Sequence, residues 1–193
     1  MGTFEKKVIL VTGAGKGTGR GVAEAFAGQG AVVAANDISP VNLDETVAHI
    51  SSAGGQVKAY VEDIAKKMPV QTLLNQVLDD LGRIDILVNC AEVEPQKTVY
   101  EMDEWDWQRT LDVNLNGPFL LTQSVGRIMK EKGGGVIVHL NARPKGTERR
   151  AAYFASKAGL VELVKAAAQE FAAFGVTVCS ADSIQDVLEV CSR

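Results

Sequence analysis

A regular alternation between short apolar runs and longer segments of helical periodicity constrains this chain more than any other feature. The apolar, β-branched runs predict strands over residues 8–11, 31–35, 57–61, 84–88, 136–140 and 176–179. The periodic segments predict helices over residues 21–28, 43–53, 69–81, 105–113, 118–130, 151–174 and 183–192. Strands that are apolar throughout are typical of a parallel sheet covered on both faces. With right-handed crossovers, the predicted fold is α/β with a doubly wound sheet of about six strands.

Composition is that of an ordinary globular protein. The 193 residues are 46% hydrophobic and 23% charged, which predicts a single domain over residues 1–193. A net charge of −4 does not favour nucleic acid as a partner. The sequence contains no apolar run of the roughly 18 residues that cross a membrane, and it does not open with a signal-peptide pattern. Three scattered cysteines and two isolated histidines predict reduced thiols, no metal site and a cytoplasmic protein.

A glycine-rich turn follows the first predicted strand and opens directly into a helix. It contains Gly13, Gly15, Gly17 and Gly19 within the run Thr-Gly-Ala-Gly-Lys-Gly-Thr-Gly. Glycines here allow a tight turn and let backbone N–H groups approach a pyrophosphate at the helix N-terminus. The strand before the turn, the helix after it and an acidic residue downstream favour a Rossmann-type dinucleotide site over an ordinary βα turn.

Asp37 is that acidic residue, at the end of the second predicted strand. A carboxylate there accepts hydrogen bonds from ribose hydroxyls and repels a 2′-phosphate, so we expect NAD, with NADP less favoured. Lys16 and Arg20 argue the other way, since a cation near the turn could pair with that phosphate. The alternative for Asp37 is a turn or helix-capping residue before Ser39.

With these motifs in place, the chain resembles the short-chain dehydrogenase/reductase family. The glycine turn matches the family's Thr-Gly-x-x-x-Gly-x-Gly pattern, with Thr18 where isoleucine or leucine is usual. The resemblance rests on four further segments: Asp63-Ile64, Asn89-Cys90-Ala91-Glu92 in place of Asn-Asn-Ala-Gly, Asn114, and Tyr153-x-x-x-Lys157. It implies that Asp63 and Ile64 hold adenine, that Asn89 and Ala91 line the cofactor, and that Lys157 binds the nicotinamide ribose together with Tyr153.

Tyr153 and Lys157 also fit catalysis on physical grounds. Residues four apart lie on one face of a helix, and an ammonium beside a phenol lowers the pKa of the phenol. A tyrosine so tuned works as an acid or base near neutral pH. The family further implies that Asn114 kinks a helix and holds a water of the proton relay. Without the family context, the pair would be read as a helix-surface contact.

The chain departs from the family where the chemistry should occur. Ala142 occupies the position of the catalytic serine, and an alanine cannot donate a hydrogen bond to a substrate carbonyl, a loss of about a hundredfold in rate. Asn141 is the candidate replacement donor, with Ser156 and Thr147 as further possibilities. Glu92 replaces a glycine beside the cofactor. The usual Pro-Gly turn after the sixth strand, the seventh strand and the substrate lid are not evident, so closure over the substrate is in doubt.

Two functions therefore remain open. The first is an NAD(P)-dependent oxidoreductase that interconverts a secondary alcohol and a ketone, with impaired or altered chemistry. The second is a catalytically inactive, nucleotide-binding pseudoenzyme that senses NAD or acts through protein interfaces. For assembly, the family implies a homodimer through a four-helix bundle of the helices at 118–130 and 151–174. A basic loop of Arg143, Lys145, Arg149 and Arg150 is read either as solvated or as attracting an anionic substrate.

Overall fold

Six parallel strands form the single sheet of the part of the chain that the computed structural model describes, residues 2–141, 146 and 148–192. The strand order is β3-β2-β1-β4-β5-β6. The strands are β1 (Val8–Thr12), β2 (Val32–Asp37), β3 (Gln56–Val61), β4 (Ile86–Asn89), β5 (Gly135–Leu140) and β6 (Val176–Ala181). This order confirms the doubly wound, Rossmann-type sheet, since the chain runs outward from β1 in one direction and then in the other.

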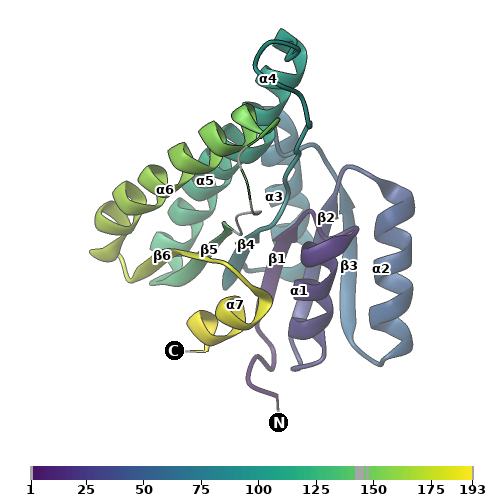
Figure 1. The fold of residues 1–193 in the computed structure, drawn as a ribbon. Coiled ribbons are helices and arrows are strands. Elements are labelled where there is room, and N and C mark those ends of the chain that lie inside the picture. Colours follow the sequence, from purple (N-terminus) through teal and green to yellow (C-terminus); the bar gives the residue numbers. More distant parts are fainter. Residues whose placement is uncertain (1, 142–145, 147, 193) are drawn as a thin grey trace.

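Helices cover both faces of the sheet (Figure 1). One core contains α1 (Gly17–Ala27), α2 (Pro40–Ser52) and α7 (Ile184–Cys191), and the other contains α3 (Lys67–Leu81), α5 (Gly117–Lys132) and α6 (Ala151–Ala172). Within β1, Ile9 and Val11 join the first core while Leu10 joins the second. This split follows from the alternation of side chains along a strand. It also explains why the strands are apolar throughout.

The sequence pattern located the elements to within a few residues. The largest shift is in α1, which begins at Gly17 and not at residue 21, because the glycine turn itself supplies the first helical turn. The short helix expected after the sixth strand is present as α7, which lies beside α1 (Figure 1). Among the described residues, no helix is both long and apolar enough to cross a bilayer.

A change of helical geometry interrupts the segment between β4 and β5. The helix α4 (Glu104–Leu111) continues directly into a π-helical turn, η1 (Asp112–Asn116), and then into α5. Asn114 lies in this wide turn and is buried. Single π-helical turns of this kind occur frequently at functional sites. The interruption of the α-helix expected at Asn114 is present as this π-helical turn.

The ends of β1, β2 and β4 lie side by side where the strand order reverses. Thr12 pairs in register with Asn36 of β2 on one side and with Asn89 of β4 on the other. The Thr12 hydroxyl accepts hydrogen bonds from the backbone N–H groups of Cys90 and Ala91, which ties the chain leaving β4 to the end of β1. In open α/β sheets this crevice is where ligands bind.

Candidate dinucleotide-binding and catalytic site

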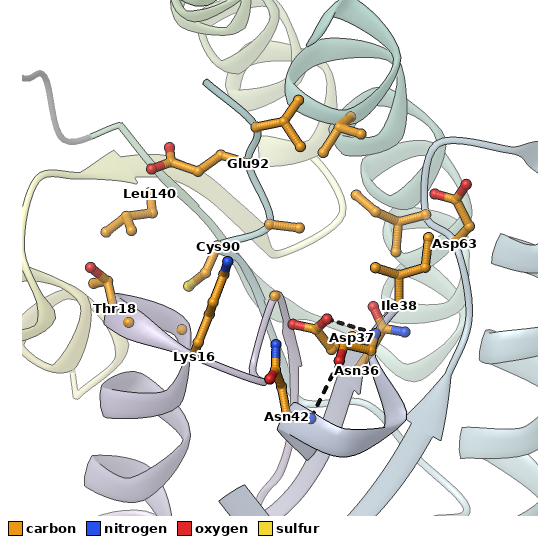
Figure 2. A pocket seen from close by; sticks show the side chains of 18 of the residues that line it. Lys16, Thr18, Asn36, Asp37, Ile38, Asn42, Asp63, Cys90, Glu92 and Leu140 are labelled. Atoms are coloured by element: carbon orange, nitrogen blue, oxygen red, sulfur yellow. Dashed lines mark hydrogen bonds between the residues drawn. The ribbon is translucent and has the colours of Figure 1, made fainter. Parts of the chain in front are cut away.

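A cavity of about 540 Å³ opens at the carboxyl ends of the central strands. Figure 2 shows Glu92 and Leu140 on one side of it and Asp63 and Ile38 on the other. Nine residues of the predicted cofactor site line it: Gly13, Lys16, Gly17, Thr18, Gly19, Asp37, Asp63, Ile64 and Ala91. The other predicted cofactor residues do not line the cavity and are buried: Gly15, Asn89, Tyr153 and Lys157. The sequence reading missed Asn36, Ile38, Asn42, Glu62 and Arg109, which also line the cavity.

The glycine turn is packed too closely for side chains at three of its positions, Gly13, Gly15 and Gly19. A Cβ atom on Gly19 would lie 2.0 Å from the carbonyl oxygen of Gly13, and Gly13 itself has a positive φ of 65°. At Gly17, by contrast, nothing lies within 4 Å of the Cβ position, and the residue faces the cavity. Within the described part of the chain, no side chain caps the N-terminus of α1. Backbone N–H groups at an uncapped helix N-terminus beside an open cavity suit a pyrophosphate.

The Asp37 carboxylate is held in place by the turn that it faces. One oxygen accepts the N–H of Gly15 at 2.9 Å and the other accepts the N–H of Ser39 at 2.9 Å. Arg20, one of the two cations considered as partners for a 2′-phosphate, does not line the cavity. Its guanidinium bonds the carbonyl oxygen of Gly15 at 2.6 Å and pairs with Glu45 at 2.8 Å, behind the turn. Of the two cations, only Lys16 lines the cavity.

Asp63 lies at the far end of the cavity, where an arginine from a distant segment meets it. Arg109 of α4 pairs with the Asp63 carboxylate at 3.0 Å, and the N–H of Ala65 donates to the same group at 3.1 Å. Burial opposes ionisation of Asp63, but the hydrogen bonds from Arg109 and Ala65 hold its pKa below the ordinary value. Asp63 and Arg109 are 46 residues apart, and the sequence carries no motif that joins them.

Tyr153 and Lys157 lie on one face of α6, and both meet Glu92. The Tyr153 hydroxyl donates to Glu92 Oε2 at 3.1 Å, and Lys157 Nζ lies 2.8 Å from the same oxygen. Lys157 also donates to the carbonyl oxygen of Leu140, at the end of β5, at 3.0 Å. The Lys157 side chain is 4% exposed and that of Glu92 is 39% exposed. Glu92 lines the cavity, so its carboxylate covers the tyrosine–lysine pair.

This contact reverses the expected effect on the tyrosine. The sequence predicted that Lys157 would lower the pKa of Tyr153. In the structure, burial raises the pKa of Tyr153, and the neighbouring Glu92 carboxylate raises it further. The ammonium of Lys157 lies 5.4 Å from the centre of the Tyr153 ring, while its direct ionic partner is Glu92. The expectation of a lowered tyrosine pKa is therefore wrong for this arrangement, because burial and the Glu92 carboxylate both disfavour the phenolate.

Asn114 fastens the loop that carries Glu92. Its side-chain oxygen accepts the N–H of Val93 at 2.8 Å, and its amide donates to the Val93 carbonyl at 2.9 Å and to the Ser156 hydroxyl at 3.2 Å. The π-helical turn thus places Asn114 between the β4 loop and α6. It is brought into the same cluster as Tyr153 and Lys157, as predicted.

A buried polar chain lies beneath this cluster. His139 of β5 meets the Thr122 hydroxyl at 3.1 Å and the Asn89 amide at 3.3 Å. Burial, with a smaller contribution from Lys157, lowers the pKa of His139 to about 3. Cys90 is buried too, and its pKa is raised to about 12, chiefly by burial, so it packs as an inert thiol. Both observations agree with the structural roles expected for these residues.

Asn141, the candidate replacement donor, is buried at the end of β5. Its N–H donates to the Ala181 carbonyl at 2.8 Å, and its side-chain oxygen is buried without a hydrogen-bond partner in the described structure. It is not part of the cavity wall given by the described residues. Ala142, Arg143, Lys145 and Thr147 lie outside the described residues. The two other arginines of the basic loop face acids: Arg149 pairs with Glu101 and Arg150 with Glu94.

Comparison with known proteins agrees with this geometry. Residues 7–182 match the family model for short chain dehydrogenases. A protein of Thermotoga maritima named as an uncharacterized oxidoreductase is 40% identical over 91% of this chain and 70% of its own length. A metagenomic short-chain oxidoreductase crystallised with NADP superimposes with a TM-score of 0.91 at 27% identity, over 99% of this chain and 93% of its own. An NAD⁺-bound xylitol dehydrogenase superimposes with a TM-score of 0.87 at 30% identity, over 92% of this chain and 69% of its own.

The strand order and the cavity at the carboxyl ends of the central strands are those of a Rossmann-type α/β protein. With a family model that spans most of its length, the chain belongs to the short-chain dehydrogenase/reductase family of oxidoreductases.

Proposed function

We propose that the protein is an NAD-dependent oxidoreductase that interconverts a secondary alcohol and a ketone, with slowed chemistry. The observation that carries the proposal is the cluster of Tyr153, Lys157 and Asn114 beside a glycine-turn cavity. Family membership supports the class of reaction. Asp37 at the cavity wall supports NAD over NADP. Among the described residues that line the cavity, the only arginine is Arg109, and it pairs with Asp63 at the other end.

The chain offers a partner to each part of such a cofactor. Backbone N–H groups of the turn from Gly17 to Gly19 would hold the pyrophosphate, Asp37 the adenosine ribose, and the Asp63–Ile64 end the adenine. Lys157 would hold the ribose next to the nicotinamide once its ion pair with Glu92 is broken. When bound, the nicotinamide supplies or accepts the hydride. Tyr153 moves a proton at the substrate oxygen, and Asn114 positions the loop after β4.

The second candidate, an NAD-binding protein without turnover, is favoured by one observation. Burial and the Glu92 carboxylate both raise the pKa of Tyr153, and Glu92 forms an ion pair with Lys157; these are the two groups on which the chemistry depends. Ala142 adds a missing hydrogen-bond donor to this obstacle.

A serine substitution separates the two candidates. If only the donor is lacking, Ala142→Ser should raise the rate on a panel of ketones and alcohols about tenfold or more. Fast turnover by the wild type with no gain in Ala142→Ser would instead identify Asn141 or a neighbour as the donor. If neither form turns over any substrate while NAD still binds, the protein is the non-catalytic binder.

For assembly we propose a homodimer built through a four-helix bundle of α5 and α6. Three alanines of α6, Ala155, Ala158 and Ala166, are exposed, as is Phe119 at 44% on α5. Small exposed side chains allow close packing of helices. Light scattering at micromolar concentration should give twice the monomer mass, and a monomer would contradict the proposal.

A further inference from the structure

Glu92 stands between the cavity and the two groups that a nicotinamide ribose would need. Its carboxylate belongs to the cavity wall, whereas Tyr153 and Lys157 are almost fully buried behind it. One carboxylate oxygen takes both the Tyr153 hydroxyl, at 3.1 Å, and the Lys157 ammonium, at 2.8 Å. With the Leu140 carbonyl as a further acceptor at 3.0 Å, the ammonium is already well satisfied.

An incoming ribose would have to replace this carboxylate with a neutral hydroxyl. Hydrogen bonds between two ionised groups are shorter and roughly twice as strong as bonds between neutral groups. Lys157 is 4% exposed, so water screens its pair with Glu92 poorly. The exchange of a carboxylate for a hydroxyl at Lys157 therefore gains little free energy. At the adenosine end, among the residues that the structure describes, the Asp37 carboxylate is bonded by backbone N–H groups and not by a charged side chain, and no side chain caps the start of α1.

We propose that Glu92 is a specificity-determining residue that withholds Lys157 and Tyr153 from the nicotinamide ribose, so that the site selects the adenosine diphosphate portion of the dinucleotide. The proposal rests on the cofactor site described above. It commits to the ligand class: ADP should bind almost as tightly as ADP-ribose or NAD⁺. The second ribose contributes affinity only after the carboxylate is removed.

Calorimetric titration of the full chain with ADP, ADP-ribose and NAD⁺ tests this without any turnover. In the wild type, the dissociation constants for ADP and ADP-ribose should agree within about threefold, since no net hydrogen bond is gained. In Glu92→Gly, ADP-ribose and NAD⁺ should each bind about tenfold more tightly relative to ADP, as expected for a new bond to a charged group. Glu92→Gln, which keeps the size but loses the charge, should shift the ratio in the same direction by a smaller amount.

Glu62→Gln is the matched control, because it removes a carboxylate from the same wall at the Asp63 end. It should change the affinities for ADP and ADP-ribose alike, leaving their ratio unchanged. If Glu92→Gly does not fold, the Glu92→Gln and Glu62→Gln pair still decides the question.

Two results would overturn the inference, and they differ in what they reject. A wild type that binds ADP-ribose tenfold more tightly than ADP, with the ratio unchanged in both Glu92 variants, rejects the role of Glu92 alone. Absence of binding for all three ligands in every variant rejects the dinucleotide site itself, and the proposed oxidoreductase function with it.

Discussion

The two ends of the cavity use their polar groups in opposite ways. At the adenosine end, the Asp37 carboxylate and the start of α1 are held in place by the glycine turn and still face open space. At the other end, Glu92, Tyr153 and Lys157 satisfy one another. Preorganised groups bind a ligand without a competing contact, whereas groups that are already paired must first give up a partner. The difference indicates that a chain can keep a family's motif residues while their side chains are already bonded to other groups of the protein and not free to bind a ligand.

Tyr153→Phe should have the largest effect of the substitutions considered. It should lower the reaction rate at the catalytic end of the cavity and leave cofactor binding at the adenosine end unchanged. Loss of the hydroxyl removes the proton donor, so any carbonyl reduction should drop about a hundredfold or more. NAD affinity should stay nearly unchanged, because the adenosine contacts do not involve Tyr153. Steady-state kinetics with calorimetry on the same preparation checks both halves. Equal rates in the variant and the wild type would remove Tyr153 from the mechanism.

Acid should lower the free energy of unfolding, because the buried His139 beneath the catalytic cluster must take up a proton when the protein unfolds. The folded-state pKa of about 3 lies below the unfolded value of about 6.5, so stability is complete above pH 6.5 and declines as the pH falls toward 3. The slope is about 1.4 kcal/mol per pH unit, which gives a loss of about 2 kcal/mol at pH 5. Urea denaturation across this range measures it.

His139→Asn should flatten that slope, while His49→Gln should not. His49 is the chain's other histidine, and its side chain is 62% exposed. A His139→Asn variant as acid-sensitive as the wild type would show that other groups cause the decline.

Cofactor choice should depend on Asp37 at the adenosine end. The carboxylate should disfavour a 2′-phosphate, so NAD should bind about tenfold more tightly than NADP. Asp37→Ser should largely erase this preference. Arg20→Gln should leave it intact, because Arg20 bonds the back of the turn and Glu45. Tighter binding of NADP by the wild type would show that Lys16 outweighs the carboxylate.

The smallest expected effect concerns the ion pair that closes the adenosine end. Arg109→Gln should lower the free energy of unfolding by about 1 kcal/mol or less, because both partners are partly exposed. Asp63 has a lowered pKa, so its stabilising contribution is present above the ordinary carboxyl pKa and is lost as the pH falls through the folded value. The difference between wild type and Arg109→Gln in urea should therefore shrink below about pH 4. A difference that persists in acid would assign it to packing of the Arg109 side chain.

Periodicity and turn chemistry predicted the sheet, its helices and the glycine turn because these features depend on local spacing. The interruption of the α-helix at Asn114 and the approach of Tyr153 to Lys157 were likewise predicted, the first from a family motif and the second from helix geometry. The direction of Arg20, by contrast, depends on Glu45 in another helix, and sequence spacing carries no such information.

The same reason explains the missed contacts at the site. Glu92 and Tyr153 are 61 residues apart in the sequence, and Arg109 and Asp63 are 46 residues apart. The sequence shows Glu92 as a bulky, negative replacement for glycine, but the contact with Lys157 depends on the direction of the Glu92 side chain, which sequence spacing does not contain. The negative charge of Glu92, visible in the sequence, is the signal that Lys157 does not act on Tyr153 alone.

A crystal structure of the complex with NAD⁺ tests the contrast between the two ends most directly. We expect the adenosine diphosphate portion to be ordered along the glycine turn and beside Asp37, with Glu92 still bonded to Lys157 and the nicotinamide ribose without fixed contacts. An ordered nicotinamide ribose bonded to Lys157 and Tyr153, with the Glu92 carboxylate turned away in the wild type, would contradict the account.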